Sequence, residues 1–321
     1  MRDTDYAFCV ARLRANERYM LGSKDIDELC SCGSYDSALA ILREKKWITT
    51  QEEINECITY QNKLLCELLW ESVPDKNELA VLCTANDFFN IKAAVKCHFT
   101  NADASGYYVY PTTLDTAKLT EYVNLHRFSK IGGVMGECAE ESYKAACLTE
   151  NGQNADIIID AAAINILKKY ADKNKGNLTG EVCAFICDTA NIKTALRCAK
   201  TNKGKDFVNV AVGECCFLDR STLIKMTLEG EEALDGYLSK STYRELVAAY
   251  RENSAEYEKM CDNEIVKLIR KAKFTCFGFD PVCAYYYGKL TEIKSVRIIL
   301  TALRAGLDAQ QIKERVRASY V

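Results

Sequence analysis

Residues 85–96 of the chain read ANDFFNIKAAVK, and related stretches occur twice more, as CDTANIKTALRCAK at 187–200 and TEIKSVRIILTALR at 291–304. Each copy centres on an aliphatic residue of the kind usually found in a protein core. An acid lies four positions before that centre, a small polar residue one position before it, and a base one position after it. The centres are Ile91, Ile192 and Val296, the acids are Asp87, Asp188 and Glu292, and the bases are Lys92, Lys193 and Arg297.

The copies recur at nearly constant steps, since Ile192 follows Ile91 by 101 residues and Val296 follows Ile192 by 104. A second motif opens with Leu-Asp at 114–119, 218–223 and 307–312. Its first two copies each begin 78 residues before the next helix centre, whereas the third lies too close to Val296 to continue the series. We interpret that third copy as shortened. The pattern predicts three helical repeats, at 1–110, 111–217 and 218–321.

Helical geometry assigns a face to each repeated position. At about 100° per residue, the acid shares the apolar face with the centre, and the base lies to one side of it. One hypothesis makes the acid a half-buried structural group that fixes helix packing. The other brings three equivalent charged groups together around a pseudo-threefold axis. Under either hypothesis, Lys92, Lys193 and Arg297 point towards solvent or a partner.

The composition favours a helical protein. Only three of the 321 residues are proline, and 48% are hydrophobic against 27% charged, as in ordinary globular proteins. The net charge of −3 offers no basic field for nucleic acid. We expect no membrane span, because no apolar run approaches about 18 residues. Charges also interrupt the N-terminal 21 residues, which argues against a signal peptide or anchor.

Local patterns predict individual elements. Apolar periodicity predicts helices at 5–20, 51–72, 156–171 and 281–302, and one or two helices at 241–272. Thr50 is the expected N-cap of the second helix, and Pro281 occupies a plausible first position of the 281–302 helix. A last helix is expected at 308–319 with Asp308 as its N-cap. The short segments 107–111 and 207–212 are interpreted as connections rather than strands.

Catalytic chemistry is not predicted. The two histidines, His98 and His126, have no recognisable nucleophile pattern around them. The close cysteine pairs at 30/32, 183/187 and 215/216 lack zinc-finger spacing, and no glycine pattern matches a nucleotide loop. We therefore expect no cofactor and no metal. The 17 cysteines are interpreted as small core residues of a reduced cytosolic protein, as at Cys9, Cys66, Cys97, Cys147, Cys198 and Cys283.

The C-terminal stretch carries a family resemblance. Residues 279–321, FDPVCAYYYGKLTEIKSVRIILTALRAGLDAQQIKERVRASYV, closely resemble the end of the C subunit of V-type (A/V-type) ATP synthases, which is related to the d subunit of eukaryotic V-ATPase. The stretches at 85–96 and 187–197 look like that family's weaker internal motif, and residues 5–21 are similar to its first helix. The matching C-terminal residues are Pro281, Tyr285, Glu292, Ile293, Lys294, Arg297, Ile298, Ile299, Leu300, Thr301, Ile312 and Arg315.

This resemblance implies an all-α, funnel-shaped protein of three similar lobes around a pseudo-threefold axis. Such a protein would sit on the cytoplasmic face of the membrane, between the proteolipid (c/K) ring and the D and F subunits of the central stalk. It would transmit torque for proton or sodium transport without a catalytic site of its own. Lys92, Lys193 and Arg297 would then line or border the socket for the stalk. The alternatives are an unrelated helical scaffold and a helical enzyme with a cysteine or carboxylate site.

Overall fold

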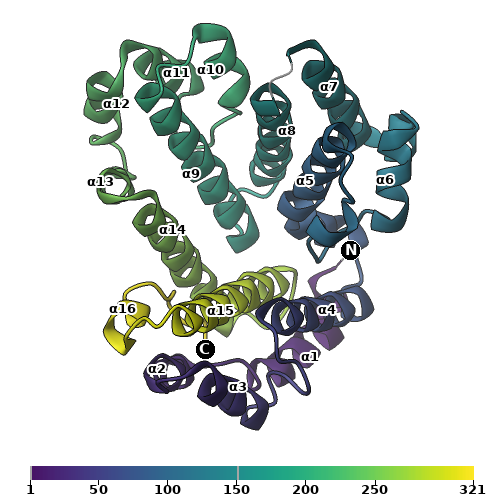
Figure 1. Cartoon of the computed structure of the whole chain (residues 1–321), viewed down its shortest axis with the longest axis vertical. Helices are drawn as coiled ribbons and strands as arrows, with labels where there is room; N and C mark the ends of the chain where they lie inside the picture. Colours follow the sequence, from purple (N-terminus) through teal and green to yellow (C-terminus); the bar gives the residue numbers. More distant parts are fainter. Residues whose placement is uncertain (1, 150–151) are drawn as a thin grey trace. The chain divides into compact units, whose positions relative to one another are not determined.

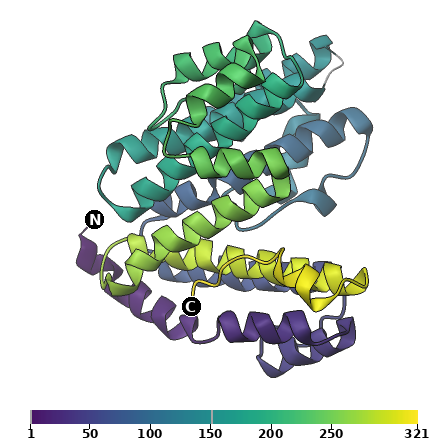
Figure 2. The same cartoon turned by 90° about the vertical axis from the view of Figure 1, so that its left-hand side faces the viewer.

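The computed structural model describes residues 2–149 and 152–321 (Figures 1 and 2). These residues form α-helices and short 3-10 helices, with no β-strand among them. The predicted all-α class is therefore confirmed. The chain divides into two compact units. Unit 1 contains the residues up to Leu79, Asn177–Val182 and Ala248–Val321, and unit 2 contains Ala80–Gly176 and Cys183–Val247.

These units differ from the sequence repeats, because the first and second repeated stretches lie in unit 2 and the third lies in unit 1. The division into repeats at 1–110, 111–217 and 218–321 stays a prediction.

Unit 1 is organised around its longest helix, α15. Most residues of α15 are buried, and it packs against α1, α2, α3, α4, α14 and α16. The helices of this unit are η1 (Asp3–Tyr6), α1 (Ala7–Glu17), α2 (Ser23–Ser31), α3 (Tyr35–Glu44), α4 (Ile54–Ser72), α14 (Ser254–Ile269), η4 (Arg270–Phe274), α15 (Asp280–Arg304) and α16 (Ala309–Lys313).

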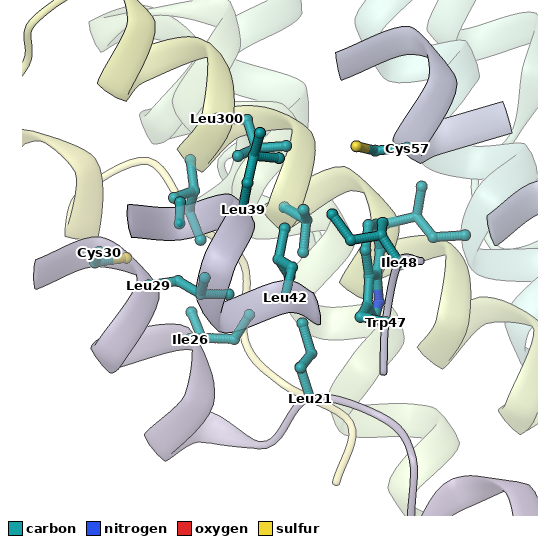
Figure 3. Packing of buried hydrophobic residues seen from close by; sticks show 14 of the residues in the cluster. Leu21, Ile26, Leu29, Cys30, Leu39, Leu42, Trp47, Ile48, Cys57 and Leu300 are labelled. Atoms are coloured by element: carbon teal, nitrogen blue, oxygen red, sulfur yellow. The ribbon is translucent and has the colours of Figure 1, made fainter. Parts of the chain in front are cut away.

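An apolar cluster of unit 1 fills the space between α2, α3, α4 and α15. Figure 3 shows Ile26 and Leu29 of α2 and Leu42 of α3 in this cluster, together with Leu300 of α15. Trp47, from the connection after α3, is 1% exposed. Fully burying a leucine or isoleucine side chain contributes about 1.5–3 kcal/mol, so this cluster fixes the N-terminal helices against α15.

Unit 2 is organised around α8. One side of α8 joins a cluster with α5, α6 and α7 that includes Ile91 and Ile159. Further along α8, Ile164 and Leu167 join a second cluster with Cys187 of α9. The helices are α5 (Lys76–Thr100), η2 (Ser105–Tyr107), α6 (Thr116–Asn124), η3 (Phe128–Lys130), α7 (Gly133–Thr149), α8 (Gly152–Lys173), α9 (Leu178–Lys200), α10 (Lys205–Ala211), α11 (Arg220–Glu229), α12 (Glu231–Leu238) and α13 (Arg244–Glu252). Of these, α5, α9 and α13 each extend across a boundary between the units.

Most helix predictions are confirmed, with α1, α4, α8 and α15 at the expected places and two helices, α13 and α14, within 241–272. Pro281 lies in the first turn of α15, and Asp308 caps α16 through the backbone N–H of Gln311. The Leu-Asp motifs also mark helix starts, since Asp115 and Asp219 occupy the N-cap positions of α6 and α11.

Three local predictions are wrong. Thr50 is not an N-cap, because α4 begins at Ile54 and the Glu56 carboxylate accepts the N–H of the capping residue Glu53. Residues 207–212 lie almost wholly within the helix α10. The last helix ends at Lys313, because side chains elsewhere in unit 1 accept the backbone N–H groups of 317 and 318 and hold that segment out of a helix.

Candidate functional site

The three repeated stretches lie on α5, α9 and α15, and their acids are buried. Asp87 and Asp188 are 0% exposed and Glu292 is 6% exposed. The central residues Ile91 and Ile192 are equally buried, as the shared helical face predicts. A carboxylate removed from water is costly unless hydrogen-bond donors replace the water. The donors around each acid therefore define what these positions do.

Asp87 holds the segment that follows η2. Its Oδ1 accepts the backbone N–H of Thr113 at 2.8 Å and the Thr112 hydroxyl, and its Oδ2 accepts the Thr113 hydroxyl at 2.6 Å. Burial raises the pKa of the Asp87 carboxyl above its usual value, against the lowering effect of these hydrogen bonds. Asp87 thus anchors the loop that leads into α6.

Asp188 makes the corresponding contacts on α9. Its two oxygens accept the backbone N–H groups of Cys216 at 2.7 Å and Phe217 at 2.8 Å. The Tyr243 hydroxyl donates a third hydrogen bond at 2.9 Å, and burial raises the pKa of that phenol strongly. Asp188 therefore anchors the loop that leads into α11, as Asp87 does before α6.

Glu292 has the same role in unit 1 with different partners. Its Oε2 accepts the backbone N–H of Leu21 at 2.7 Å, and its Oε1 accepts the Trp47 indole N–H at 2.6 Å. Lys289, one turn earlier on α15, forms a buried ion pair with the same carboxylate. This pair was not predicted, although the spacing of three residues on one helix was available in the sequence as a signal.

The small polar residue before each centre is a second anchor. The Asn90 side chain accepts the N–H of Val109 at 2.8 Å and donates to its carbonyl at 3.0 Å. Asn191 accepts the N–H of Gly213 and donates to the carbonyl of Glu214. In the third copy, Ser295 accepts the N–H of Arg317 at 3.2 Å. The acid and this residue together bind main chain of their own unit.

The three predicted bases differ in their surroundings. Lys92 is paired with Asp160 of α8, with its side chain 19% exposed. Lys193 is half-buried, whereas Arg297 is exposed. Arg297 has no ion pair or hydrogen bond with any residue in 2–149 or 152–321, although its neighbours Lys294 and Arg317 both pair with Asp262. A socket-lining role for the three bases stays a prediction.

A cleft of about 460 Å³ opens beside the buried pair in unit 1, lined by residues of α1, α4 and α15. Lys289 and Trp47 lie in its wall, with the Lys289 ammonium 5.5 Å from the Trp47 ring centroid. At the rim, Arg12 pairs with Glu71 at 2.7 Å. The charges of the cleft are thus mostly matched within the chain.

The other candidates from the sequence have structural partners. His98 bonds Asn124 and the Tyr143 hydroxyl, and His126 stacks near Phe128 in the same aromatic cluster. Across the described ranges, no group of three or more His, Cys, Asp or Glu side chains is arranged to hold a metal ion. Within the described residues, none of the 17 cysteines forms a disulfide. Of the six expected in the core, Cys147 is exposed and Cys66 half-buried, and the other four are buried.

No helix within 2–149 or 152–321 combines the length and hydrophobicity needed to span a bilayer.

Comparison with known proteins identifies the family. The ATP synthase (C/AC39) subunit family matches residues 9–315. The chain is 19% identical over 318 residues to the C subunit of the V-type sodium ATPase of Enterococcus hirae, covering 96% of this chain and 97% of the relative. It is 21% identical over 341 residues to the C subunit of the A-type ATP synthase of Methanocaldococcus jannaschii, covering 96% and 85%. A further relative, the C subunit of the A-type ATP synthase of Methanobrevibacter smithii, is 29% identical over 154 residues, covering 45% and 40%.

Because the family match spans nearly the whole sequence, the chain belongs to the ATP synthase (C/AC39) subunit family. The resemblance seen in residues 279–321 is thereby confirmed. The membership supports a role as one subunit of a rotary V-type or A-type ATPase complex.

Proposed function

We propose that this protein is the non-catalytic connector of a rotary V-type ATPase, between the D and F subunits of the central stalk and the membrane proteolipid (c/K) ring. The observation that carries the proposal is the family match across residues 9–315. In this role the protein transmits torque for ion transport, of protons or sodium, on the cytoplasmic face of the membrane. Its three repeats form similar lobes around a pseudo-threefold axis.

The local chemistry supports a mechanical role. The acids at 87, 188 and 292 and the polar residues before the helix centres are occupied by main-chain groups. Fully satisfied buried polar groups make a structure rigid, and a coupling part has to resist twisting. The buried acids are therefore assigned to stiffness rather than to proton transfer.

The bases at the repeated positions are proposed to border the surface that receives the central stalk. Arg297 supports this assignment best, because it is exposed and has no partner within the described residues. Lys92 is already paired with Asp160 and would contribute through a shared ion pair. Complementary charges at such a rim direct the partner's approach and orientation more than they add affinity.

Co-purification tests the connector role. The protein, expressed with the complex's D and F stalk proteins and its ring proteolipid, should elute with both. Assembly of those neighbours without this chain bound to either would contradict the proposal. In that case an unrelated helical scaffold becomes the better description.

Charge reversal tests the proposed socket. The Lys92→Glu, Lys193→Glu and Arg297→Glu triple variant should bind the isolated stalk about tenfold more weakly or worse. The matched control reverses Lys96, Arg197 and Lys294, which lie on the same three helices. Helix content, measured by circular dichroism, should be the same in both variants. Equal stalk binding by the two variants would remove the bases from the interface and leave the connector role intact.

A further inference from the structure

The cleft of unit 1 beside Lys289 contains polar groups that the packing of Glu292 leaves unused. Its wall consists of residues from α1, α4 and α15 and from the connections that follow α1 and α3. All of these residues belong to unit 1, so the cleft is complete within one compact unit. Its volume of about 460 Å³ lies in the range of small-molecule sites. The proposed connector role gives this space no occupant.

Tyr285 of α15 carries a hydroxyl group without a partner. The residue lines the cleft and is only 5% exposed. Among the residues that the structure describes, none forms a hydrogen bond with this hydroxyl. Burial raises the pKa of the phenol strongly, and the charges of Glu292 and Glu17 add to the effect, so the hydroxyl keeps its proton and can donate. A buried hydroxyl that meets no acceptor costs free energy, and the cleft is where an acceptor can enter.

Lys289 adds a second donor to the same wall. It lies one helical turn after Tyr285, and residues four positions apart share a helix face, so the two side chains are neighbours at the cleft. An ammonium group has three N–H donors, of which Glu292 accepts one. Lys289 itself is 7% exposed. A hydroxyl and an ammonium side by side are donors that a carboxylate accepts well.

The charges of the wall favour a negative ligand. Glu71 and Glu67 are the carboxylates that line the cleft, and each already has a cation. Arg12 pairs with Glu71 at 2.7 Å, and Lys63 lies 3.9 Å from Glu67. Lys46 also lines the cleft and is exposed, and its ammonium has no ion pair or hydrogen bond within the described chain. The charge left without a partner is therefore positive.

Leucines of α4 give the cleft an apolar side. Leu64 and Leu68 line it, and Leu64 is 40% exposed. An aliphatic group that lies in the cleft would cover this surface and remove it from water. The cleft thus combines two buried donors, one exposed cation and an apolar wall.

We propose that this cleft binds a small carboxylic acid with an aliphatic body, in its anionic form. The carboxylate accepts the Tyr285 hydroxyl and an N–H of Lys289, and the exposed Lys46 ammonium attracts its charge. The aliphatic body lies against Leu64 and Leu68. The proposal is independent of the connector role, because it concerns a space within unit 1 and needs no neighbouring subunit.

Isothermal titration calorimetry of the full-length protein with octanoate tests the proposal. We expect one octanoate to bind per chain. Two matched probes keep the eight-carbon body and change the head group, since 1-octanol is neutral and octylamine is positively charged. Octanol should bind at least about tenfold more weakly, because it loses the charge-assisted hydrogen bonds, and octylamine should bind more weakly still. Absence of octanoate binding below its micelle-forming concentration would overturn the proposal, and so would equal binding of either control.

The variant Tyr285→Phe locates the site. It removes only the hydroxyl, so the free energy of unfolding in urea should not fall, whereas octanoate should bind about tenfold more weakly. Lys46→Gln should weaken binding about two- to fivefold. The control Lys24→Gln changes an exposed lysine of α2 outside the cleft and should leave binding as it is. Octanoate binding that Tyr285→Phe leaves unaltered would place the ligand elsewhere and refute the assignment.

Discussion

Replacing Glu292 with glutamine tests how far unit 1 depends on its buried acid. The substitution keeps the shape of the side chain but removes its charge. The wild-type carboxylate receives the Leu21 N–H, the Trp47 indole N–H and the Lys289 ammonium. A glutamine has a single acceptor oxygen, and its amide N–H₂ group would face one of these donors. The Lys289 charge would stay buried without its partner.

The expected cost follows from this arrangement. Removing one partner of a buried ion pair costs about 3–5 kcal/mol, because an uncompensated charge remains. Domains of ordinary size have a free energy of unfolding of about 5–15 kcal/mol, so the effect is a large share of the stability of unit 1. Adding Lys289→Met removes the stranded charge. The double variant should therefore recover more than half of the loss.

Tryptophan fluorescence during unfolding in urea is the assay. Trp47 and Trp70 are the two tryptophans of the chain, and both lie in unit 1. Their signal therefore reports on this unit, and midpoint and slope together give its free energy of unfolding. A Glu292→Gln loss below about 1 kcal/mol would refute the reasoning. A double variant no more stable than the single one would refute it equally.

Three further predictions concern the other anchors and one close contact. Asp188→Asn should lower the free energy of unfolding by about 1–3 kcal/mol, because an amide cannot accept two backbone N–H groups on separate atoms. Asp87→Asn should lower it less, since two of the three donors to Asp87 are hydroxyl groups, which can instead accept a hydrogen bond from the new amide. Equal losses of stability in chemical unfolding would contradict this contrast. Burial raises the pKa of Asp87 above its ordinary 3.8, so the folded state binds the proton more tightly and the free energy of unfolding should fall as pH rises from 3.8 through the raised pKa. Asp87→Asn should flatten that fall, and an unchanged pH profile would count against it. In Gly288→Ala, the new methyl group would meet the Tyr320 ring at 2.7 Å, which should destabilise unit 1 by about 1–3 kcal/mol, as measured by thermal unfolding. The control Gly236→Ala, with open space in α12, should be neutral or stabilising in the same measurement.

Periodicity predicted the helices well because it depends on local geometry. The 100° step alone puts Asp87, Asp188 and Glu292 on the same face as buried aliphatic residues, and the structure buries all three. The backbone partners of these acids are distant in the sequence. Leu21, for example, precedes its partner Glu292 by 271 residues. Nothing in a single sequence encodes such a long-range pairing directly, so the roles of Leu21 and Trp47 as partners of Glu292 were not predicted.

The failed local predictions have the same origin. The segment 207–212 has the residue preferences of a strand, but α10 is helical because it packs against α8 and α11. The segment after Lys313 has a helical pattern, yet Ser295 and Asn263 accept its backbone N–H groups instead. Tertiary contacts determine the conformation of both segments, and secondary-structure propensity is a weak guide where such contacts compete with it.

The polar side chains of α5 and α9 bind backbone groups of their loops, and this affects how far the loop sequences can diverge. Asn90 and Asn191 bind N–H and C=O groups that nearly every amino acid supplies. The side chains of these loops can therefore be substituted while the backbone conformation of the loops is kept. Such an architecture can retain its shape when four of five residues differ, which is the divergence between this chain and its relatives at 19% and 21% identity.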